Sequence, residues 1–332
     1  MDVPVPRLSV VIPTFRRPEL LARCLDALLV QTLPGEAFEV IVVDDGCTED
    51  TRAACDDAAR RSGALGGPVI RYLRPQGTRG PAAARNRGWR AAAGAVIAFT
   101  DDDTIPDTDW LREGEAALAA VGVVAAWGHV HVPLPAAMTD NARNTAGLEN
   151  AVFVTANAFA RRDALHAVGG FDERYRRAWR EDTDLYFALI ARFGAAAVVA
   201  APAARVLHPV RDAKFLVSVA QQANMAFDAL LFKKYPGLYD RHVGMRRPPP
   251  TYALIVGATA FALLAAPAAP RAALAALALA IALVLAFAAR RLRGLDKSPR
   301  VVVEMLVSSF AIPFVSLFWR VVGAWRFRVA FF

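Results

Sequence analysis

The 332-residue sequence has few cysteines and lacks the glycine-rich phosphate signatures of common nucleotide enzymes. The number and spacing of Cys24, Cys47 and Cys55 fit neither a disulfide framework nor a zinc site, which agrees with a reducing compartment. No Walker-type loop is present and no GxGxxG follows the first expected strand, which argues against kinases, simple NTPases and dinucleotide enzymes. Residues 1–9 have no apolar core, so we expect no secretory signal there.

Long apolar runs are present, and they lie in the last quarter of the chain. Apolar residues make up 55% of the sequence, and two 18-residue runs cover 251–268 and 272–289. As helices, each run would extend about 27 Å, close to the thickness of a bilayer core. We therefore predict a transmembrane hairpin over 248–293, with two buried core helices as the alternative.

Positive charge gathers on the two outer flanks of this hairpin. Only Arg271 lies in the turn, whereas the flanks carry Arg246, Arg247, Arg290, Arg291, Arg293, Lys297 and Arg300. Cytoplasmic loops carry the excess of lysine and arginine, so we expect a multi-pass protein of the cytoplasmic membrane with its N-terminal domain in the cytoplasm. In the last segment, 294–332, the apolar run 301–319 is interrupted by Glu304 and Pro313, and it is either interfacial or a third span.

The first 247 residues alternate between short β-branched runs and helical patterns, which predicts one α/β domain. Expected strands cover 8–12, 40–43, 69–73 and 96–99, and expected helices cover 18–31, about 51 onward, and 82–93. This alternation predicts a mostly parallel sheet covered on both faces. In such sheets, ligands bind beyond the carboxyl ends of the strands.

Aspartates stand at two of these strand ends. Asp44 and Asp45 follow the second expected strand, and Asp101, Asp102 and Asp103 follow the fourth. Adjacent carboxylates repel one another, and a divalent cation removes that cost. Oxygen ligands on a short loop suit Mg²⁺ or Mn²⁺, with water and substrate phosphate in the remaining positions. The alternative is a solvated acidic turn.

A basic segment precedes the acidic loop. It contains Arg79, Arg85, Arg87 and Arg90, and Arg85 and Asn86 fall on the helix that leads to the fourth strand. One or two of these arginines could bind a phosphate or a base edge, the alternative being ordinary helix-surface residues. The net charge of +8 raises the question of nucleic-acid binding, but no basic patch with interleaved stacking aromatics occurs outside the tail, so we expect no nucleic-acid partner.

Six short motifs in order resemble those of family-2 glycosyltransferases. They are Ser9-Val10-Val11-Ile12-Pro13-Thr14-Phe15, Val42-Val43-Asp44-Asp45-Gly46, Ala84-Arg85-Asn86-Arg87-Gly88, Phe99-Thr100-Asp101-Asp102-Asp103, Gly169-Gly170-Phe171-Asp172-Glu173 with Asn157 before it, and Glu181-Asp182-Thr183-Asp184-Leu185. Together they cover about residues 8–210. The resemblance implies a GT-A fold, in which a Rossmann-like nucleotide-binding half is fused to an acceptor-binding half, here over 1–247.

The resemblance also implies roles for individual residues. It places the nucleoside near Pro13, Thr14 and Asp45, and the donor near Arg85, Asn86, Asp101 and Asp102. It implies a DxD motif in which Asp101 and Asp103 hold the metal on the donor diphosphate, while Asp102 could share that role. It implies that His208 completes the metal site and that Asp182 is the catalytic base. Asn157, Trp179 and Glu181 are expected on the acceptor side, although Trp179 could equally be a core residue.

The chemistry of glycosyl transfer suits these residue types. A divalent cation neutralises charge developing on a nucleoside diphosphate leaving group, and a carboxylate can take the proton of an acceptor hydroxyl. We therefore predict an inverting, hexosyltransferase-type enzyme that uses a UDP-, GDP- or dTDP-sugar and a lipid-linked or cell-envelope glycan acceptor. The alternatives are a polyprenyl-phosphate glycosyltransferase and a non-catalytic nucleotide-binding subunit of an envelope assembly complex. The acidic residues before Thr183 could instead be helix N-terminal acids favoured by the dipole.

Overall fold

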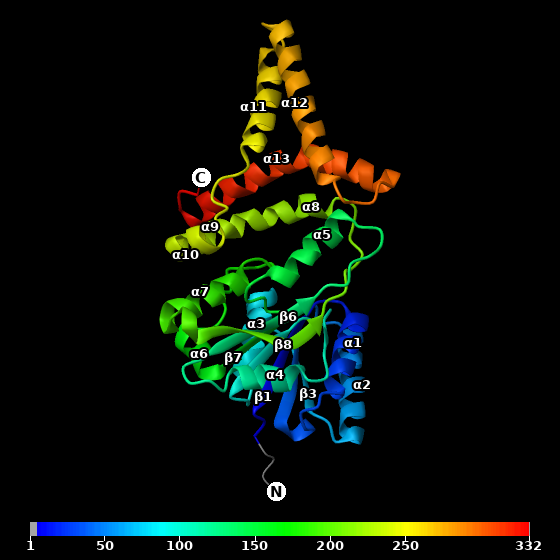
Figure 1. Ribbon diagram of the computed structural model, residues 1–332, viewed down its shortest axis with the longest axis vertical. Coiled ribbons are helices and arrows are strands. Elements are labelled where there is room, and N and C mark those ends of the chain that lie inside the picture. Colours follow the sequence, from blue (N-terminus) through cyan, green and yellow to red (C-terminus); the bar gives the residue numbers. More distant parts are fainter. Residues whose placement is uncertain (1–4, 332) are drawn as a thin grey trace. The chain divides into compact units, whose positions relative to one another are not determined.

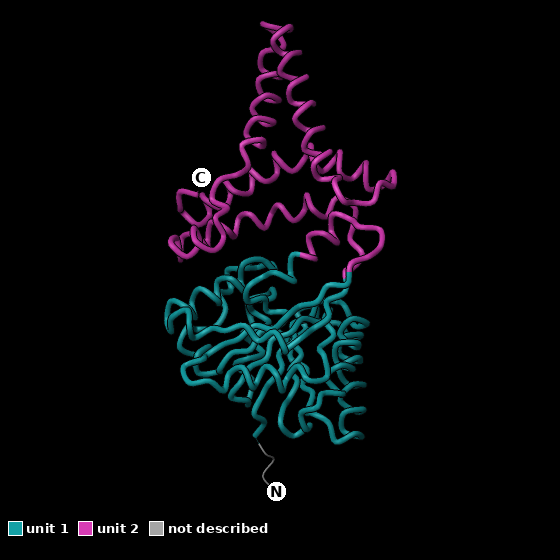
Figure 2. Tube along the Cα trace, in the orientation of Figure 1, with its two compact units in different colours: residues 1–133, 147–209 teal, residues 134–146, 210–332 magenta. Residues whose placement is uncertain are grey.

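A computed structural model describes residues 5–331 and divides the chain into two compact units (Figure 2). Unit 1 consists of Met1–Pro133 and Gly147–Pro209, and unit 2 of Leu134–Ala146 and Val210–Phe332. Residues 1–4 and 332, which belong to the predicted domains 1–247 and 294–332, lie outside the described residues, and so do the first four residues of the stretch 1–9. The units do not follow the predicted boundary at 247, because the helices after Pro209 pack with the C-terminal helix.

In residues 5–331, unit 1 contains an eight-stranded mixed sheet in the order β3-β2-β1-β4-β7-β6-β8-β5. Its strands are β1 (Leu8–Thr14), β2 (Phe38–Asp44), β3 (Val69–Leu73), β4 (Val96–Thr100), β5 (Ile105–Pro106), β6 (Ala125–His131), β7 (Asn157–Arg161) and β8 (Val198–Leu207). The four strands predicted from the sequence are β1 to β4, and they pair in parallel. β7 then runs antiparallel to both β4 and β6, which makes the other half of the sheet mixed.

Helices cover the parallel half of the sheet on both faces (Figure 1). The helices of unit 1 are α1 (Pro18–Leu29), α2 (Glu49–Leu65), α3 (Pro81–Ala91), α4 (Trp110–Ala117), α6 (Arg162–Val168) and α7 (Glu181–Phe193). The strand order, with right-handed crossovers, places α1 and α2 on one face and α3 on the other. α3 lies close to β1, since a Cβ on Gly88 would stand 2.4 Å from Val11 Cγ1.

The parallel pairing brings three polar strand ends to one edge of the sheet. Thr14 of β1 stands opposite Asp44 of β2 in the register, and Thr100 ends the neighbouring strand β4. All three side chains are buried, as are Ile12 of β1, Val43 of β2 and Phe99 of β4. The loops that follow these strands therefore begin from fixed positions.

Unit 2 is helical. Its helices are α5 (Asp140–Ala146), α8 (Val217–Ala220), α9 (Met225–Lys234), α10 (Pro236–His242), α11 (Pro250–Ala265), α12 (Pro270–Arg291) and α13 (Pro299–Phe327). The predicted hairpin corresponds to α11 and α12, which pack side by side (Figure 1). Among the described residues, α12 and α13 are long and apolar enough to cross a membrane, and α11 is a shorter apolar helix.

Candidate active site

The loop after β4 carries the three adjacent aspartates, and Asp102 is its most restrained member. Asp102 is 3% exposed and accepts hydrogen bonds from Thr14 Oγ1 (2.7 Å) and Arg17 Nη1 (3.1 Å). Burial raises the pKa of the Asp102 carboxyl to about 6, and Arg17 opposes the rise. Asp102 therefore fixes the loop against β1, and its neighbours on either side are placed by the same contacts.

Asp103 lies close to a histidine that follows a strand in the other half of the sheet. His208 follows β8, is 7% exposed, and has its Nε2 atom 3.6 Å from Asp103 Oδ1. Its backbone N–H donates to His131 O (2.8 Å), which fixes the position of the residue after the strand.

This spacing suits a shared divalent cation. Ligand atoms sit about 2.1 Å from Mg²⁺ or Mn²⁺, so two atoms 3.6 Å apart can both reach one ion. No group of three or more histidine, cysteine, aspartate or glutamate residues among 5–331 forms a ready metal site. The pair Asp103 and His208 thus fits an ion that is also held by substrate phosphate and water.

Arg85 connects the acidic loop with the start of α7. Its guanidinium is 2% exposed and donates from Nη2 to Asp101 Oδ1 (2.7 Å) and from Nη1 to Glu181 Oε1 (3.0 Å). The planar, forked geometry of arginine allows one side chain to hold two carboxylates in a fixed relation. Residues 96 positions apart in the chain are thereby held at one site.

The first turn of α7 carries Glu181 and Asp182. Burial, followed by the charge of Asp182, raises the pKa of Glu181 to about 7, and burial likewise raises the pKa of Asp182. Asp182 Oδ1 accepts from the Thr183 backbone N (2.6 Å) and from Thr183 Oγ1 (3.2 Å). These two contacts fix the carboxylate. A carboxylate with a raised pKa is a suitable proton acceptor near neutral pH.

The two aspartates that end β2 have different surroundings. Asp44 is fully buried and accepts from the backbone N of Gly46 (2.8 Å) and of Thr48 (2.9 Å), so it shapes the turn that leads into α2. Asp45 Oδ2 accepts from Gly80 N (3.0 Å), while its Oδ1 atom is buried and has no hydrogen-bond partner among the described residues. Asp45 therefore keeps an acceptor atom for a ligand, as expected of a nucleoside contact.

Two asparagines predicted at the site make structural contacts. Asn86 donates from Nδ2 to Phe171 O (2.8 Å) and Glu173 Oε1 (2.9 Å), and its Oδ1 accepts from Trp89 Nε1 (2.8 Å). Asn157 is fully buried, and its Nδ2 donates to two backbone carbonyls of β6 and β8 while Oδ1 accepts from Trp110 Nε1 (2.8 Å). In both residues the amide hydrogens are used within the fold, so each holds neighbouring segments in place.

The remaining predicted residues lie beside these groups. Pro13 and Thr14 end β1, and Thr14 already contacts the acidic loop through Asp102. Trp179 is half-buried, and Arg180 lies over its ring at 4.9 Å, so it is not a core tryptophan. Arg180, with φ of 71°, immediately precedes α7 in the left-handed region, a conformation that costs a non-glycine residue energy and is commonest at functional sites.

Sequence reasoning missed Arg17, which binds Asp102 and lies 3.9 Å from Asp103. A signal was present, because Arg16 and Arg17 directly follow the turn that ends β1, at the sheet edge where the aspartates gather. A cation there compensates part of the acidic charge when no metal is bound.

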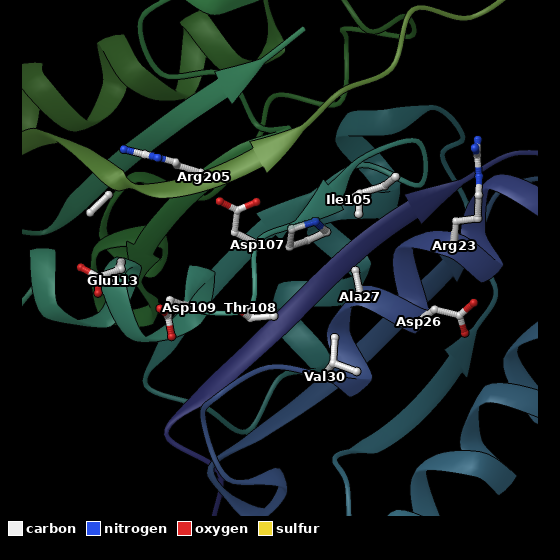
Figure 3. A pocket seen from close by; sticks show the side chains of 12 residues that line it. Arg23, Asp26, Ala27, Val30, Ile105, Asp107, Thr108, Asp109, Glu113 and Arg205 are labelled. Carbon is white, nitrogen blue, oxygen red and sulfur yellow. The ribbon is translucent and has the colours of Figure 1, made fainter. Parts of the chain in front are cut away.

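A separate cavity of about 820 Å³ lies between α1, α4, β5 and β8 (Figure 3). Its charged lining residues are Arg23, Asp26, Asp107, Asp109, Glu113 and Arg205. None of the predicted site residues lines it, although β5 and residues 107–109 closely follow the acidic loop. We therefore locate the active site at the carboxyl edge of β1, β2 and β4, on the chemistry of its side chains.

Comparison with known proteins shows which family the chain resembles. Residues 9–169 match the family described as Glycosyl transferase family 2. Glycosyltransferase AglE of Haloferax volcanii is 32% identical over 52% of this chain and 58% of its own length. Validoxylamine A glucosyltransferase of Streptomyces hygroscopicus subsp. limoneus is 39% identical over 35% of this chain and 24% of its own length. The matched segments thus span about half or less of these curated relatives.

The fold also has a solved counterpart. The mannosyltransferase PcManGT from Pyrobaculum calidifontis, in complex with GDP-Man and Mn²⁺, superposes with a TM-score of 0.57. The alignment covers 97% of this chain and 88% of that one, at 21% identity. This likeness supports the GT-A architecture, and the chain's mixed α/β sheet has the arrangement of that class.

Proposed function

From the premise that residues 9–169 form a glycosyl transferase family 2 domain, we propose that this chain is an inverting, metal-dependent glycosyltransferase. It transfers a sugar from a nucleotide-sugar donor to a hydroxyl acceptor. The observation that carries the proposal is the buried Arg85, which joins Asp101 of the acidic loop to Glu181 at the start of α7. This contact supports the proposal, because it connects Asp101, an expected metal ligand, with the start of α7, where the expected base Asp182 follows Glu181.

The donor half of the site is formed by strand ends. Asp45, with its unpartnered buried oxygen, contacts the nucleoside beside Pro13 and Thr14. Asp101, Asp103 and His208 hold Mn²⁺ or Mg²⁺, with Asp102 fixing the loop between them. When bound, the cation neutralises charge on the departing nucleoside diphosphate. The printed ligands of the Pyrobaculum enzyme, GDP-Man and Mn²⁺, support a donor and metal of this class.

The acceptor half supplies the base. Asp182 accepts the proton of the acceptor hydroxyl as its oxygen forms a bond to the anomeric carbon, and the bond from that carbon to the diphosphate oxygen breaks. Attack from the face opposite the leaving group inverts the anomeric centre. The Thr183 contacts hold one carboxylate oxygen, which leaves Oδ2 to take the proton. Trp179, two residues before Glu181, is the aromatic residue that we assign to the acceptor side.

We further propose that α11 and α12 anchor the enzyme in the cytoplasmic membrane, with the transferase domain in the cytoplasm. Support comes from the apolar residues that both helices expose, among them Leu263, Leu264 and Leu274, and from the flanking arginines. An anchored enzyme of this kind suits a lipid-linked or cell-envelope glycan acceptor.

The test is nucleotide binding to the detergent-purified protein by calorimetry. UDP, GDP, dTDP and CDP are titrated with and without Mn²⁺, and one diphosphate is expected to bind tightly only when the metal is present. Asp103→Ala serves as the site variant and Asp107→Ala, exposed four residues further on, as its matched control. Failure of every nucleotide to bind the folded protein would overturn the enzyme proposal and favour an assembly subunit.

A further inference from the structure

We infer that α13 lies in the plane of the membrane interface, with its apolar side in lipid, and does not cross the bilayer. The inference rests on the proposed membrane hairpin α11–α12 and concerns unit 2 alone. α13 has 29 residues and is apolar enough to span, so length and composition do not separate the two arrangements.

The exposed side of α13 is apolar, whereas its buried side combines polar groups with apolar residues such as Met305 and Ile312. Its buried side carries polar groups: Ser308 and Ser309 are fully buried, and Ser316 and Arg320 are 2% exposed. Its exposed side carries large apolar residues, namely Val303, Phe310, Phe318 and Trp325, which are 49%, 54%, 59% and 81% exposed. Such a continuous apolar surface needs a cover, and lipid is the cover already adjacent to α11 and α12.

The contacts of α13 with the hairpin settle its direction. Arg291, the last residue of α12, donates to Ser308 Oγ (2.7 Å) and Ser309 Oγ (3.1 Å). Arg320, one turn of α13 after Ser316, donates to the carbonyls of Met245 (3.1 Å) and Arg246 (2.9 Å), which precede α11. α13 therefore meets the polar end of each hairpin helix, and those two ends lie at the same membrane surface.

The separation of these two contacts along α13 excludes a spanning orientation. Ser308 and Arg320 are about 18 Å apart along α13 at 1.5 Å per residue. In a spanning helix these positions would differ in depth by most of that length, so they could not both contact the same end of the hairpin. Figure 1 shows α13 running crosswise to α11 and α12, as these contacts require.

The contacts between α13 and α9 also support an interfacial position for α13. A Cβ on Gly323 would stand 2.5 Å from Ala226 O of α9, and Lys233 of α9 donates to Phe327 O (2.8 Å). If α13 crossed the bilayer, α9 would bring Lys233 and Lys234 toward the hydrocarbon core, where charged side chains are costly. At the interface both lysines remain near water and anionic headgroups.

The experiment measures depth by quenching of a small fluorophore on single cysteines. Cys24, Cys47 and Cys55 are first replaced by alanine or serine, and the full chain is reconstituted in vesicles of phosphatidylcholine and phosphatidylglycerol. Labels at Val303, Phe310 and Phe318 are expected to be quenched alike by lipids carrying a quencher near the headgroup. A label at Ile281 of α12 should respond to quenchers deep in the acyl chains, and a label at the inward Ser316 should respond to neither.

Two other outcomes would count against the inference, and they are distinguishable. A depth that changes steadily from Val303 to Phe318 would show a spanning helix and overturn the inference while leaving the hairpin intact. A shallow or unquenched label at Ile281 would overturn the hairpin proposal and, with it, the inference. Monodisperse elution and the helical circular dichroism signal of each labelled protein establish that the fold is retained.

Discussion

Arg85 and Asp101 are joined by a 2.7 Å hydrogen bond, and the other nitrogen of the same guanidinium holds Glu181. We predict that Arg85→Lys lowers kcat about 100-fold, because a lysine keeps the charge but cannot hold both carboxylates, and displacements of about 1 Å can cost that much. The measurement is steady-state transfer to the acceptor that supports the highest rate. Arg90→Lys on the same helix, at a half-exposed side chain, is the control and should leave kcat within twofold. Equal effects of the two variants would contradict the bridging role.

Asp182→Asn is expected to remove transfer and retain nucleotide binding. The loss in kcat should be about 100- to 10,000-fold, the range for removal of a general base. Calorimetry of the donor nucleotide with Mn²⁺ checks that the donor site is intact. The matched control is Asp163→Asn, because Asp163 is an exposed acid in the first turn of α6 and tests whether a helix N-terminal acid alone explains the effect. Retained transfer in Asp182→Asn would eliminate the base assignment.

Asp103→Ala should abolish the metal dependence of nucleotide binding. Asp103 lies 3.6 Å from His208 and is 7% exposed, so its loss removes one of the proposed metal ligands. We expect the same nucleotide affinity with and without Mn²⁺ in this variant, and unchanged metal dependence in Asp107→Ala. His208→Ala should resemble Asp103→Ala. An Mn²⁺ effect of full size in Asp103→Ala would contradict the metal assignment.

The pH profile follows from the carboxylates of α7. A base must be deprotonated, and burial raises the pKa of Asp182 above its usual 3.8, so kcat/KM falls as the pH drops through that raised value. Glu181, whose pKa is raised to about 7 partly by the charge of Asp182, is the last of the two carboxyls to lose its proton as the pH rises. Glu181→Gln should therefore leave the acid limb that Asp182 sets in place. A limb that moves in Glu181→Gln, measured between pH 4 and 8, would show that Asp182 does not set it alone.

Unit 2 contains an ion pair whose removal should destabilise it. Arg291 and Asp140 have side chains only 11% and 8% exposed, and their atoms are 2.7 Å apart. Breaking a buried pair by removing one partner costs about 3–5 kcal/mol. Arg291→Met should lower the unfolding temperature in detergent, whereas Arg290→Met, at the exposed neighbouring position, should leave it nearly unchanged. Similar melting of both variants would show that the pair contributes little.

Local patterns predicted the parallel half of the sheet. The expected strands 8–12, 40–43, 69–73 and 96–99 all lie within β1 to β4, since buried β-branched runs between polar turns carry their own signal. Strand β7 was not among the expected strands, because Asn157–Arg161 is short and contains no β-branched residue. The resemblance to family motifs pointed to the aspartates after β2 and β4. The structure adds the hydrogen bonds from Thr14 and Arg17 that restrain the loop after β4.

Long-range contacts could not be predicted from the sequence. The roles of Asn86 and Arg85 depend on Phe171, Asp101 and Glu181, residues that lie 16 to 96 positions away in the chain. The tie between Arg291 and Asp140 joins positions 151 apart and leaves no local pattern. Only the folded chain brings these side chains together. In the sequence, nothing in the number or spacing of these charged residues distinguishes them from other charged residues.

The insertion 134–146 has a practical consequence for dissecting the protein. α5 leaves the sheet between β6 and β7 and belongs to unit 2, where Asp140 binds Arg291, and Arg143 donates to the carbonyls of Arg291 and Arg293. A truncation after residue 209 would therefore leave Asp140 and Arg143 of α5 without the groups that they contact in unit 2. A fragment restricted to unit 1 calls for two edits, removal of the residues after 209 and a short polar replacement of 134–146.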